Sequence, residues 1–84
     1  MYKIVIKKSA GKEIDCVPDP SFLKIDKAIL SLREDPYPYP RSKKLKGENK
    51  FRLRIGAYRV IYSVDEKQKI ITVYRVRHRK DVYR

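Results

Sequence analysis

The spacing of apolar residues changes along this chain, and each change predicts a different element. Residues 2–6 are a short β-branched run, which predicts a first strand. Within residues 19–34, apolar residues recur with the period of one helical face, at Phe22, Ile25, Ile29 and Leu32, with Leu23 and Leu30 widening the stripe. This pattern predicts an amphipathic helix whose apolar side packs on a sheet. From residue 50 onward the period becomes two, as in a half-buried strand.

Start and stop signals bound two helices. Ser9 is placed to cap a short helix that runs to about Cys16. Asp19 followed by Pro20 is a start signal for the second helix, with Asp19 as its N-cap. Because Asp35 precedes a proline and is pushed out of the helical region, we expect the second helix to end near Glu34.

Residues 50–64 predict two strands joined by a tight turn. Polar and apolar residues alternate strictly in residues 50–55, and the alternation resumes in residues 58–64. Gly56 and Ala57 fit a two-residue hairpin turn in which the glycine supplies a positive φ. If the apolar side chains of both strands meet in one core, three arginines gather on the reverse face of the sheet: Arg52, Arg54 and Arg59.

The rest of the chain completes a single domain of residues 1–84. Prolines exclude helix and central strand from residues 36–40, which predict an extended connector whose tyrosines, Tyr37 and Tyr39, pack over the helix. A polar turn at residues 65–69 precedes a strand at residues 70–74. The predicted fold class is α+β: an N-terminal strand, a two-helix hairpin on one face of a small, mainly antiparallel curved sheet, and a short C-terminal helix.

Charge distinguishes the two halves of the chain. The 84 residues include 22 Lys or Arg and 10 Asp or Glu, for a formal net charge of +12. Residues 1–40 contain seven basic and six acidic side chains, whereas residues 41–84 contain fifteen and four. A positive excess confined to one half indicates a surface that binds a polyanion, most simply nucleic acid. An acidic protein or an anionic membrane surface would satisfy the same charge.

Composition also excludes several kinds of site. A single cysteine, Cys16, allows neither an intramolecular disulfide nor a cysteine-based metal site, and we expect it to be buried as a small apolar residue. The ten carboxylates form no spaced cluster and there is one histidine, so we expect no metal and no small-molecule cofactor. No signal peptide or membrane-spanning run is visible, and we expect a cytoplasmic protein with no membrane partner.

The three arginines predict a phosphate site, because guanidinium groups held close together repel one another unless an anion lies among them. Such a site suits metal-free RNA cleavage, in which a ribose 2′-OH attacks the neighbouring phosphate. Arginine does not accept a proton, which leaves proton transfer to His78, Tyr83, a lysine such as Lys50, or the substrate. The alternatives are a solvated strand face for the arginines, a structural role for His78 and simple packing for Tyr83.

Two separate segments resemble the RelE/ParE superfamily of toxins from toxin–antitoxin systems, most closely its RelE-like branch. They are residues 43–62, with Leu45-Lys46-Gly47 and Phe51-Arg52-Leu53-Arg54-Ile55-Gly56-Ala57-Tyr58-Arg59-Val60-Ile61-Tyr62, and residues 75–84, with His78-Arg79-Lys80-Asp81-Val82-Tyr83. The resemblance implies a RelE-like fold and an mRNA endonuclease that enters the ribosomal A site, cleaves without metal and so inhibits translation. It also implies a cognate antitoxin that is acidic in the segment wrapping the toxin.

The resemblance carries over site residues position by position. Arg59 and Arg79 correspond to arginines that clamp the scissile phosphate, and Tyr83 to a tyrosine that orients the nucleotide. Two arginines stand where the family has lysines, and His78 is then a substitute acid or base. The predicted catalytic set is Arg52, Arg54, Arg59, Arg79, Tyr83 and His78; the predicted RNA- and ribosome-binding set is Lys43, Lys44, Lys46, Lys50, Arg75, Arg77 and Lys80.

Two other functions stay open on the sequence. One is inhibition of DNA gyrase by binding, as in the ParE branch, and the other is RNA binding by a catalytically weak relative. The dense arginine set together with Tyr83 favours the endonuclease, since a gyrase inhibitor needs no phosphate site.

Overall fold

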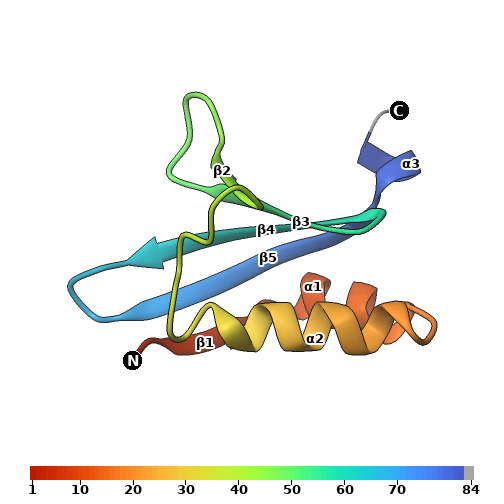
Figure 1. The fold of residues 1–84 in the computed structure, drawn as a ribbon. Helices are drawn as coiled ribbons and strands as arrows, with labels where there is room; N and C mark the ends of the chain where they lie inside the picture. The colour runs from red at the N-terminus through yellow and green to blue at the C-terminus, as the bar shows by residue number, and fades with distance from the viewer. Residues whose placement is uncertain (83–84) are drawn as a thin grey trace.

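The computed structural model describes residues 1–82, with side chains through residue 80. Its elements in chain order are β1 (Lys3–Ile6), α1 (Lys8–Asp15), α2 (Ser21–Ser31), β2 (Ser42–Lys44), β3 (Phe51–Ile55), β4 (Tyr58–Asp65), β5 (Ile70–His78) and α3 (Arg79–Val82) (Figure 1). The predicted α+β class, N-terminal strand and two helices are confirmed. The helix α3 is a single turn at the end of the described chain.

The strands form one mixed sheet in the order β1-β5-β4-β3-β2. The strand β1 runs parallel to β5, and the other neighbours are antiparallel. The sequence did not indicate β2, because all three of its residues are polar. It also predicted too short a last strand: β5 continues past residue 74 to His78, because β4 is long enough to pair with it as far as Tyr58.

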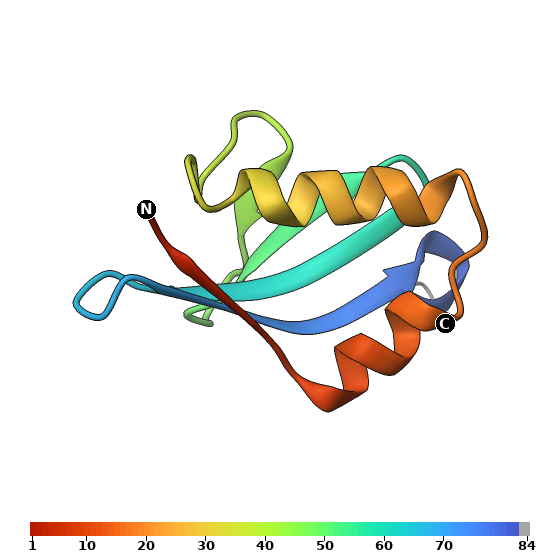
Figure 2. The same ribbon diagram turned by 90° about the horizontal axis from the view of Figure 1, so that it is seen from below.

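Both helices cover the same face of the sheet, and the other face stays open, as predicted (Figure 1, Figure 2). The core lies between these layers and is formed by buried side chains of α2 and the central strands, including Ile25, Ile29, Leu32, Leu53, Val60, Tyr62, Ile71, Val73 and Val76. We call the uncovered side the open face.

The hairpin between β3 and β4 follows the sequence closely. Ile55 pairs with Tyr58, so the loop contains only Gly56 and Ala57. Gly56 has a φ of +58°, the left-handed backbone that glycine adopts without the steric cost of a Cβ atom. This short turn fixes the register of the two strands, and with it the side chains that share each face.

The helix α2 differs from its predicted bounds. It begins at Ser21 with Pro20 at the N-cap position, and no side chain caps it. Backbone carbonyls do this work, since Phe22 N donates to Pro18 O at 3.1 Å. The helix ends at Ser31, three residues before the expected end, and the chain then tightens into a turn in which Glu34 N bonds Ser31 O.

Two exposed leucines limit the apolar stripe of α2. Leu23 is 54% exposed and Leu30 is 48% exposed, so the prediction that they widen the core-facing stripe is wrong. The small sheet offers contact only to the central ridge of the helix, where Ile25 and Ile29 are buried.

The helix α1 ends near Cys16 as predicted, but its N-terminal cap and the burial of Cys16 differ from prediction. Lys7, not Ser9, stands at the N-cap, and Ser9 Oγ instead donates to Tyr74 O of β5 at 3.0 Å. A tertiary partner has thus replaced the local cap. Cys16 follows the last turn and is exposed, so the expectation that it is buried is wrong.

The proline-rich connector runs along the sheet. The prediction that its tyrosines pack over the helix is therefore wrong. The Tyr37 ring packs at a tilt against the Phe51 ring, with the two centroids 5.1 Å apart, and its hydroxyl donates a hydrogen bond to Glu66. Tyr39 is 93% exposed. A buried hydrogen bond anchors the connector to β4, because the Tyr62 hydroxyl donates to Pro36 O at 2.7 Å.

Candidate functional site

The strand register places basic residues in two parallel rows across the open face. Arg54 of β3 pairs with Arg59 of β4, which pairs in turn with Arg77 of β5. The second row lies two residues further along each strand and consists of Lys43, Arg52, Ile61 and Arg75. Arg41 joins the first row, because its carbonyl accepts Arg54 N at 3.0 Å and extends the β2–β3 ladder. Cross-strand neighbours lie on one face, so the structure brings the three arginines predicted from sequence together.

Two recesses lie between these side chains. One, of about 150 Å³, is lined by Pro40, Arg41, Lys43, Arg52, Arg54 and Arg59. The other, of about 320 Å³, is lined by Arg54, Gly56, Arg59 and Arg79. Arg54 and Arg59 line both, so the recesses form one continuous site. Among the described residues no carboxylate lines either recess, which makes the site suited to a phosphate group.

Arg79 reaches the site through the β3–β4 turn. Its backbone N donates to Ala57 O at 2.6 Å, which ties the start of α3 to the hairpin. Its exposed side chain then lies next to Gly56 in the second recess. An arginine 20 or more residues away in the sequence is thereby placed beside Arg54 and Arg59.

The arginines of the site differ in burial. Arg59 is only 8% exposed, whereas Arg54 and Arg79 are exposed. Within the described part of the chain, Arg54, Arg79 and the half-buried Arg52 form no ion pair with a carboxylate. Like charges placed directly opposite one another on a sheet are destabilising. An anionic ligand among them would relieve this repulsion.

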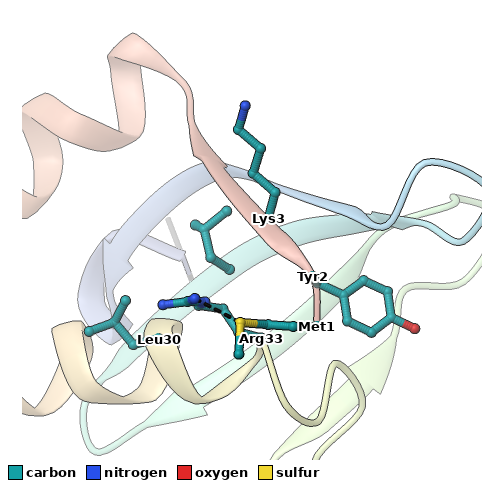
Figure 3. A pocket seen from close by; sticks show the side chains of 6 residues that line it. Met1, Tyr2, Lys3, Leu30 and Arg33 are labelled. Atoms are coloured by element: carbon teal, nitrogen blue, oxygen red, sulfur yellow. Dashed lines mark hydrogen bonds between the residues drawn. The ribbon is translucent and has the colours of Figure 1, made fainter.

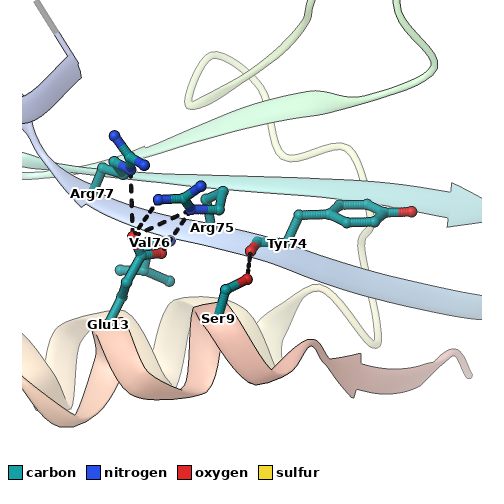
Figure 4. A network of polar contacts seen from close by, with 6 residues as sticks. All are labelled: Ser9, Glu13, Tyr74, Arg75, Val76 and Arg77. Carbon is teal, nitrogen blue, oxygen red and sulfur yellow. Dashed lines mark hydrogen bonds and ion pairs between the residues drawn. The ribbon is translucent and has the colours of Figure 1, made fainter.

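Glu13 of α1 terminates both basic rows at the edge of β5 (Figure 4). Its Oε1 accepts Val76 N at 2.8 Å, and its Oε2 lies 3.0 Å from Arg75 Nη2 and 3.3 Å from Arg77 Nε. One carboxylate thus satisfies a backbone N–H of the sheet edge and orients two arginines. Arg75 and Arg77 were predicted to bind RNA, and the structure shows them held by this residue.

Sequence reasoning missed Arg41 and Glu13. Arg41 precedes Lys43 by two residues, so alternation would have placed both on the open face had Ser42–Lys44 been recognised as a strand. Glu13 carries no such signal, because its partners are 62 to 64 residues away.

Several predicted residues lie away from the recesses. His78 pairs with Tyr58, on the opposite face from Arg59, and its ring meets the Tyr58 ring edge-on at 5.1 Å between centroids. Its Nδ1 accepts Lys80 N at 3.2 Å, at the start of α3. Lys44 pairs with Phe51 on the helix-covered side. Tyr83 lies outside the described residues.

The remaining predicted lysines are spread over the surface. Lys50 lies over the Tyr74 ring, 4.6 Å from its centroid, at the far end of β3 from Arg54. Lys46, in the loop after β2, and Lys80 are exposed. The structure therefore brings Arg52, Arg54, Arg59 and Arg79 together with Lys43. The lysines Lys46, Lys50 and Lys80 lie outside the recesses.

An apolar recess of about 430 Å³ lies on the other side of the molecule, between β1 and α2 (Figure 3). It is lined by Met1, Tyr2, Lys3, Ile4, Leu30 and Arg33. Arg33 reaches across it to Met1 Sδ at 2.8 Å. No arginine of the open face takes part, so this recess is separate from the phosphate-type site.

No group of three metal-ligating side chains occurs among the described residues, and no helix in that part of the chain is long and apolar enough to cross a membrane. Residues 5–83 match the sequence profile of a family described as the ParE toxin of type II toxin–antitoxin systems, parDE. This chain belongs to the RelE/ParE family of toxins. The resemblance inferred from the two segments is confirmed.

Solved structures support the same family for the toxin. The RelE of an archaeal RelE–RelB complex from Pyrococcus horikoshii OT3 is 30% identical, with a TM-score of 0.83 over 93% of this chain and 94% of that chain. The corresponding chain of a RelB–RelE antitoxin–toxin complex from Methanococcus jannaschii is 28% identical, with a TM-score of 0.76 over 94% of each chain. The isolated Escherichia coli RelE toxin shares the fold, with a TM-score of 0.81 at 22% identity over 99% and 92% of the two chains.

Proposed function

We propose that this toxin is a ribosome-dependent mRNA endonuclease that cleaves in the A site without a metal ion. The observation that carries the proposal is the convergence of Arg52, Arg54, Arg59 and Arg79 around two connected recesses on the open face. A scissile phosphate held there would meet guanidinium groups from β3, β4 and the start of α3. One guanidinium group can donate two parallel hydrogen bonds to two oxygens of a phosphate, and it stays charged at every working pH.

The proposed reaction transfers the phosphoryl group from the 5′ oxygen of one nucleotide to the 2′ oxygen of its neighbour. The ribose 2′ oxygen attacks phosphorus, the bond from phosphorus to the 5′ oxygen breaks, and a 2′,3′-cyclic phosphate and a 5′-OH end form. One proton leaves the 2′-OH and one is delivered to the 5′ oxygen. The arginines contribute by stabilising the charge that accumulates on the phosphate oxygens in the transition state.

Lys43 is the best-placed residue for proton transfer. Among the described residues it is the one side chain lining either recess that exchanges a proton, because the other ionisable side chains there are arginines. It faces Arg52 across the β2–β3 pair. The two arginines that replace the family lysines supply charge, and a lysine on the neighbouring strand supplies the exchangeable proton. His78, on the other face, is not assigned this role.

We also propose a cognate antitoxin as the toxin's partner. The relatives from Pyrococcus horikoshii and Methanococcus jannaschii were solved as complexes of RelE with RelB. The net charge of +12 fits a partner that is acidic in its wrapping segment.

The test uses purified toxin and ribosomes programmed with a defined message, with mRNA ends mapped by primer extension. We expect cuts at one position in the A site, and none on the same message free in solution. An intact message on ribosomes would contradict the proposal. If the message is cut, the 3′ product should carry a 5′-OH, as the 2′-OH route requires.

Inhibition of DNA gyrase is the second candidate, because the matching family profile is described by its ParE member. In that case DNA replication would stop before protein synthesis when the toxin is induced. The arginine site would then have no substrate, and substitution of its residues would leave toxicity unchanged. Binding of RNA without cleavage is the third candidate, and a fall of affinity with salt in the absence of cuts would identify it.

A further inference from the structure

A second basic groove lies between α2 and the end of β3, beside the candidate site. It has a volume of about 630 Å³. One wall is α2, which lies on the β3 side of the sheet and presents Lys24 and Lys27 three residues apart on one helix face (Figure 2). The other wall is formed by Arg41 and Arg54. Neither residue set predicted from the sequence includes Lys24, Lys27 or Arg41.

The groove is continuous with the candidate site. Arg41 and Arg54 line both the groove and the 150 Å³ recess that also contains Arg59. Their backbones are joined by the Arg54 N to Arg41 O hydrogen bond of 3.0 Å, so the two side chains belong to one rigid strand pair. A row of cations therefore passes from Arg59 around the edge of β3 to α2.

The chemistry of the groove favours a phosphodiester chain over a peptide. Four of its lining side chains are long cations, and no described carboxylate lines it. Its apolar floor is only Ala28 and the half-buried Ile55. A peptide that docks in a groove depends on pockets for apolar anchors, whereas a nucleic-acid backbone needs only cations spaced along its path.

We infer that this groove binds RNA backbone, as a track for phosphates that lie beyond the one held among the arginines of the site. The inference rests on the proposed function, since it extends the path of the same substrate complex. The phosphates come either from the message itself or from ribosomal RNA next to it, and the two sources share the chemistry that the groove recognises.

The test measures binding alone, so that its result does not depend on cleavage. The variant is Lys24→Ala with Lys27→Ala, and the matched control is Lys8→Ala with Lys12→Ala, which removes two exposed lysines from α1. Both variants carry the same net charge. One probe is a fluorescent single-stranded RNA of about 12 nucleotides, and the other is vacant ribosomes. Dissociation constants are measured over a range of salt concentrations.

We expect the groove variant to bind roughly tenfold more weakly at low salt, and its salt slope to be smaller by about 1.4 on single-stranded RNA, whereas the control changes less. Loss on the oligonucleotide assigns the groove to the message, and loss on ribosomes alone assigns it to ribosomal RNA. Equal behaviour of the two variants on both probes would overturn the inference. A polyglutamate peptide serves as a third probe, and a loss confined to this peptide would also overturn the inference, because it would assign the groove to an acidic protein segment.

The outcome is separable from that of the proposed function. A wild-type toxin that binds RNA through Lys24 and Lys27 but cuts nothing would refute cleavage and keep the groove. A toxin that cuts mRNA while the groove variant binds RNA normally would support cleavage and refute the role of the groove. If both variants have the melting temperature of the wild type, folding is unaffected, as expected for alanine at exposed helix positions.

Discussion

Arg59 shows how a single side chain acquires its setting from the sheet. It is 8% exposed and its cross-strand neighbours on either side are Arg54 and Arg77. Burial keeps water from screening the guanidinium charge, so a phosphate in the adjoining recess interacts with it more strongly than with an exposed lysine. Arg79 approaches the same recess from α3 and is exposed, which makes it the easier of the two to replace without disturbing the fold.

Replacement of Arg79 by alanine should therefore lower the rate of cleavage with little effect on stability. Removing one donor that stabilises transition-state charge typically costs about 10²- to 10³-fold in rate. The measurement is the single-turnover rate on programmed ribosomes, with Lys67→Ala, at an exposed position of the β4–β5 turn, as the control. A variant of both Arg59 and Arg79 that remained as toxic as the parent would contradict the site.

Proton transfer gives a second prediction at this scale. Lys43→Arg keeps the positive charge in the recess but removes the exchangeable proton, so cleavage should fall at least about 10²-fold while ribosome binding is retained. His78→Gln should leave the pH–rate profile in shape and rate close to wild type, because the ring packs against Tyr58 on the other face. The opposite ranking of the two variants would return the role to His78.

Among the elements, α1 and β5 are coupled in a way that strand periodicity does not describe. β1 pairs with β5 only as far as Val73, and beyond that point α1 covers the edge. Ser9 donates to Tyr74 O, and Glu13 accepts Val76 N. The helix therefore supplies hydrogen bonds that a longer β1 would otherwise make, and it covers an edge of β5 that could pair with another chain.

Glu13→Ala should lower the free energy of unfolding by about 2 kcal/mol, because it leaves a sheet-edge N–H without its acceptor and two arginines without their carboxylate. Glu13 is only 24% exposed in its side chain, so water replaces it poorly. Urea unfolding measures the change, and Glu48→Ala, at an exposed loop position, is the control. A loss no larger than that of the control would mean that the edge is not held by this carboxylate.

The whole molecule separates its charges by position. The arginine rows lie on the open face near the β3–β4 turn. At the opposite end of the molecule, Glu66 contacts residues of the N-terminus, the connector and the β4–β5 turn. Tyr2 donates to Glu66 Oε1 at 2.6 Å, Tyr37 donates to Oε2, and Lys69 lies 3.4 Å away. These hydrogen bonds hold the pKa of Glu66 below its ordinary value, and burial together with the Glu66 contact raises the pKa of Tyr37.

Stability should therefore depend on pH through Glu66. A carboxylate whose pKa is lower in the folded state contributes stability above its ordinary pKa of 4.5, and this contribution is lost as the pH falls through the lower folded value. Glu66→Gln should accordingly flatten the loss of stability below about pH 4.5 relative to wild type, measured by urea midpoints over an acid pH series. Glu48→Gln is the control, and an identical pH dependence of the Glu66 variant and wild type would contradict the role of the contact.

Periodicity alone was enough to predict the layers and the basic face. The alternation in residues 50–64 and the glycine at position 56 fix which side chains share a face, because both are properties of consecutive residues. The helical spacing of Ile25, Ile29 and Leu32 likewise predicted the covered side of the sheet. The family resemblance rested on the same segments, and the family match confirms it.

Other expectations failed because a partner distant in sequence replaced a local one. Ser9 does not cap its helix, because its hydroxyl donates to Tyr74 O. Tyr37 of the connector packs against Phe51 of β3 and not on α2. Cys16 is exposed at the end of α1, whereas Ile14 and Val17 on either side of it pack against the core. Such outcomes depend on which surfaces are available for packing, and the chain does not encode this locally.

The sequence by itself determined the α+β class, the open basic face, the hairpin turn and the family. Only the tertiary structure decided that Arg41 and Lys43 join the site, that Arg79 reaches it through Ala57 while His78 turns to the other face, and that Glu13 closes the arginine rows. The physical reason is range: side-chain period and turn preference act between neighbours, whereas these placements come from strand pairing and hydrogen bonds between residues as much as 63 positions apart.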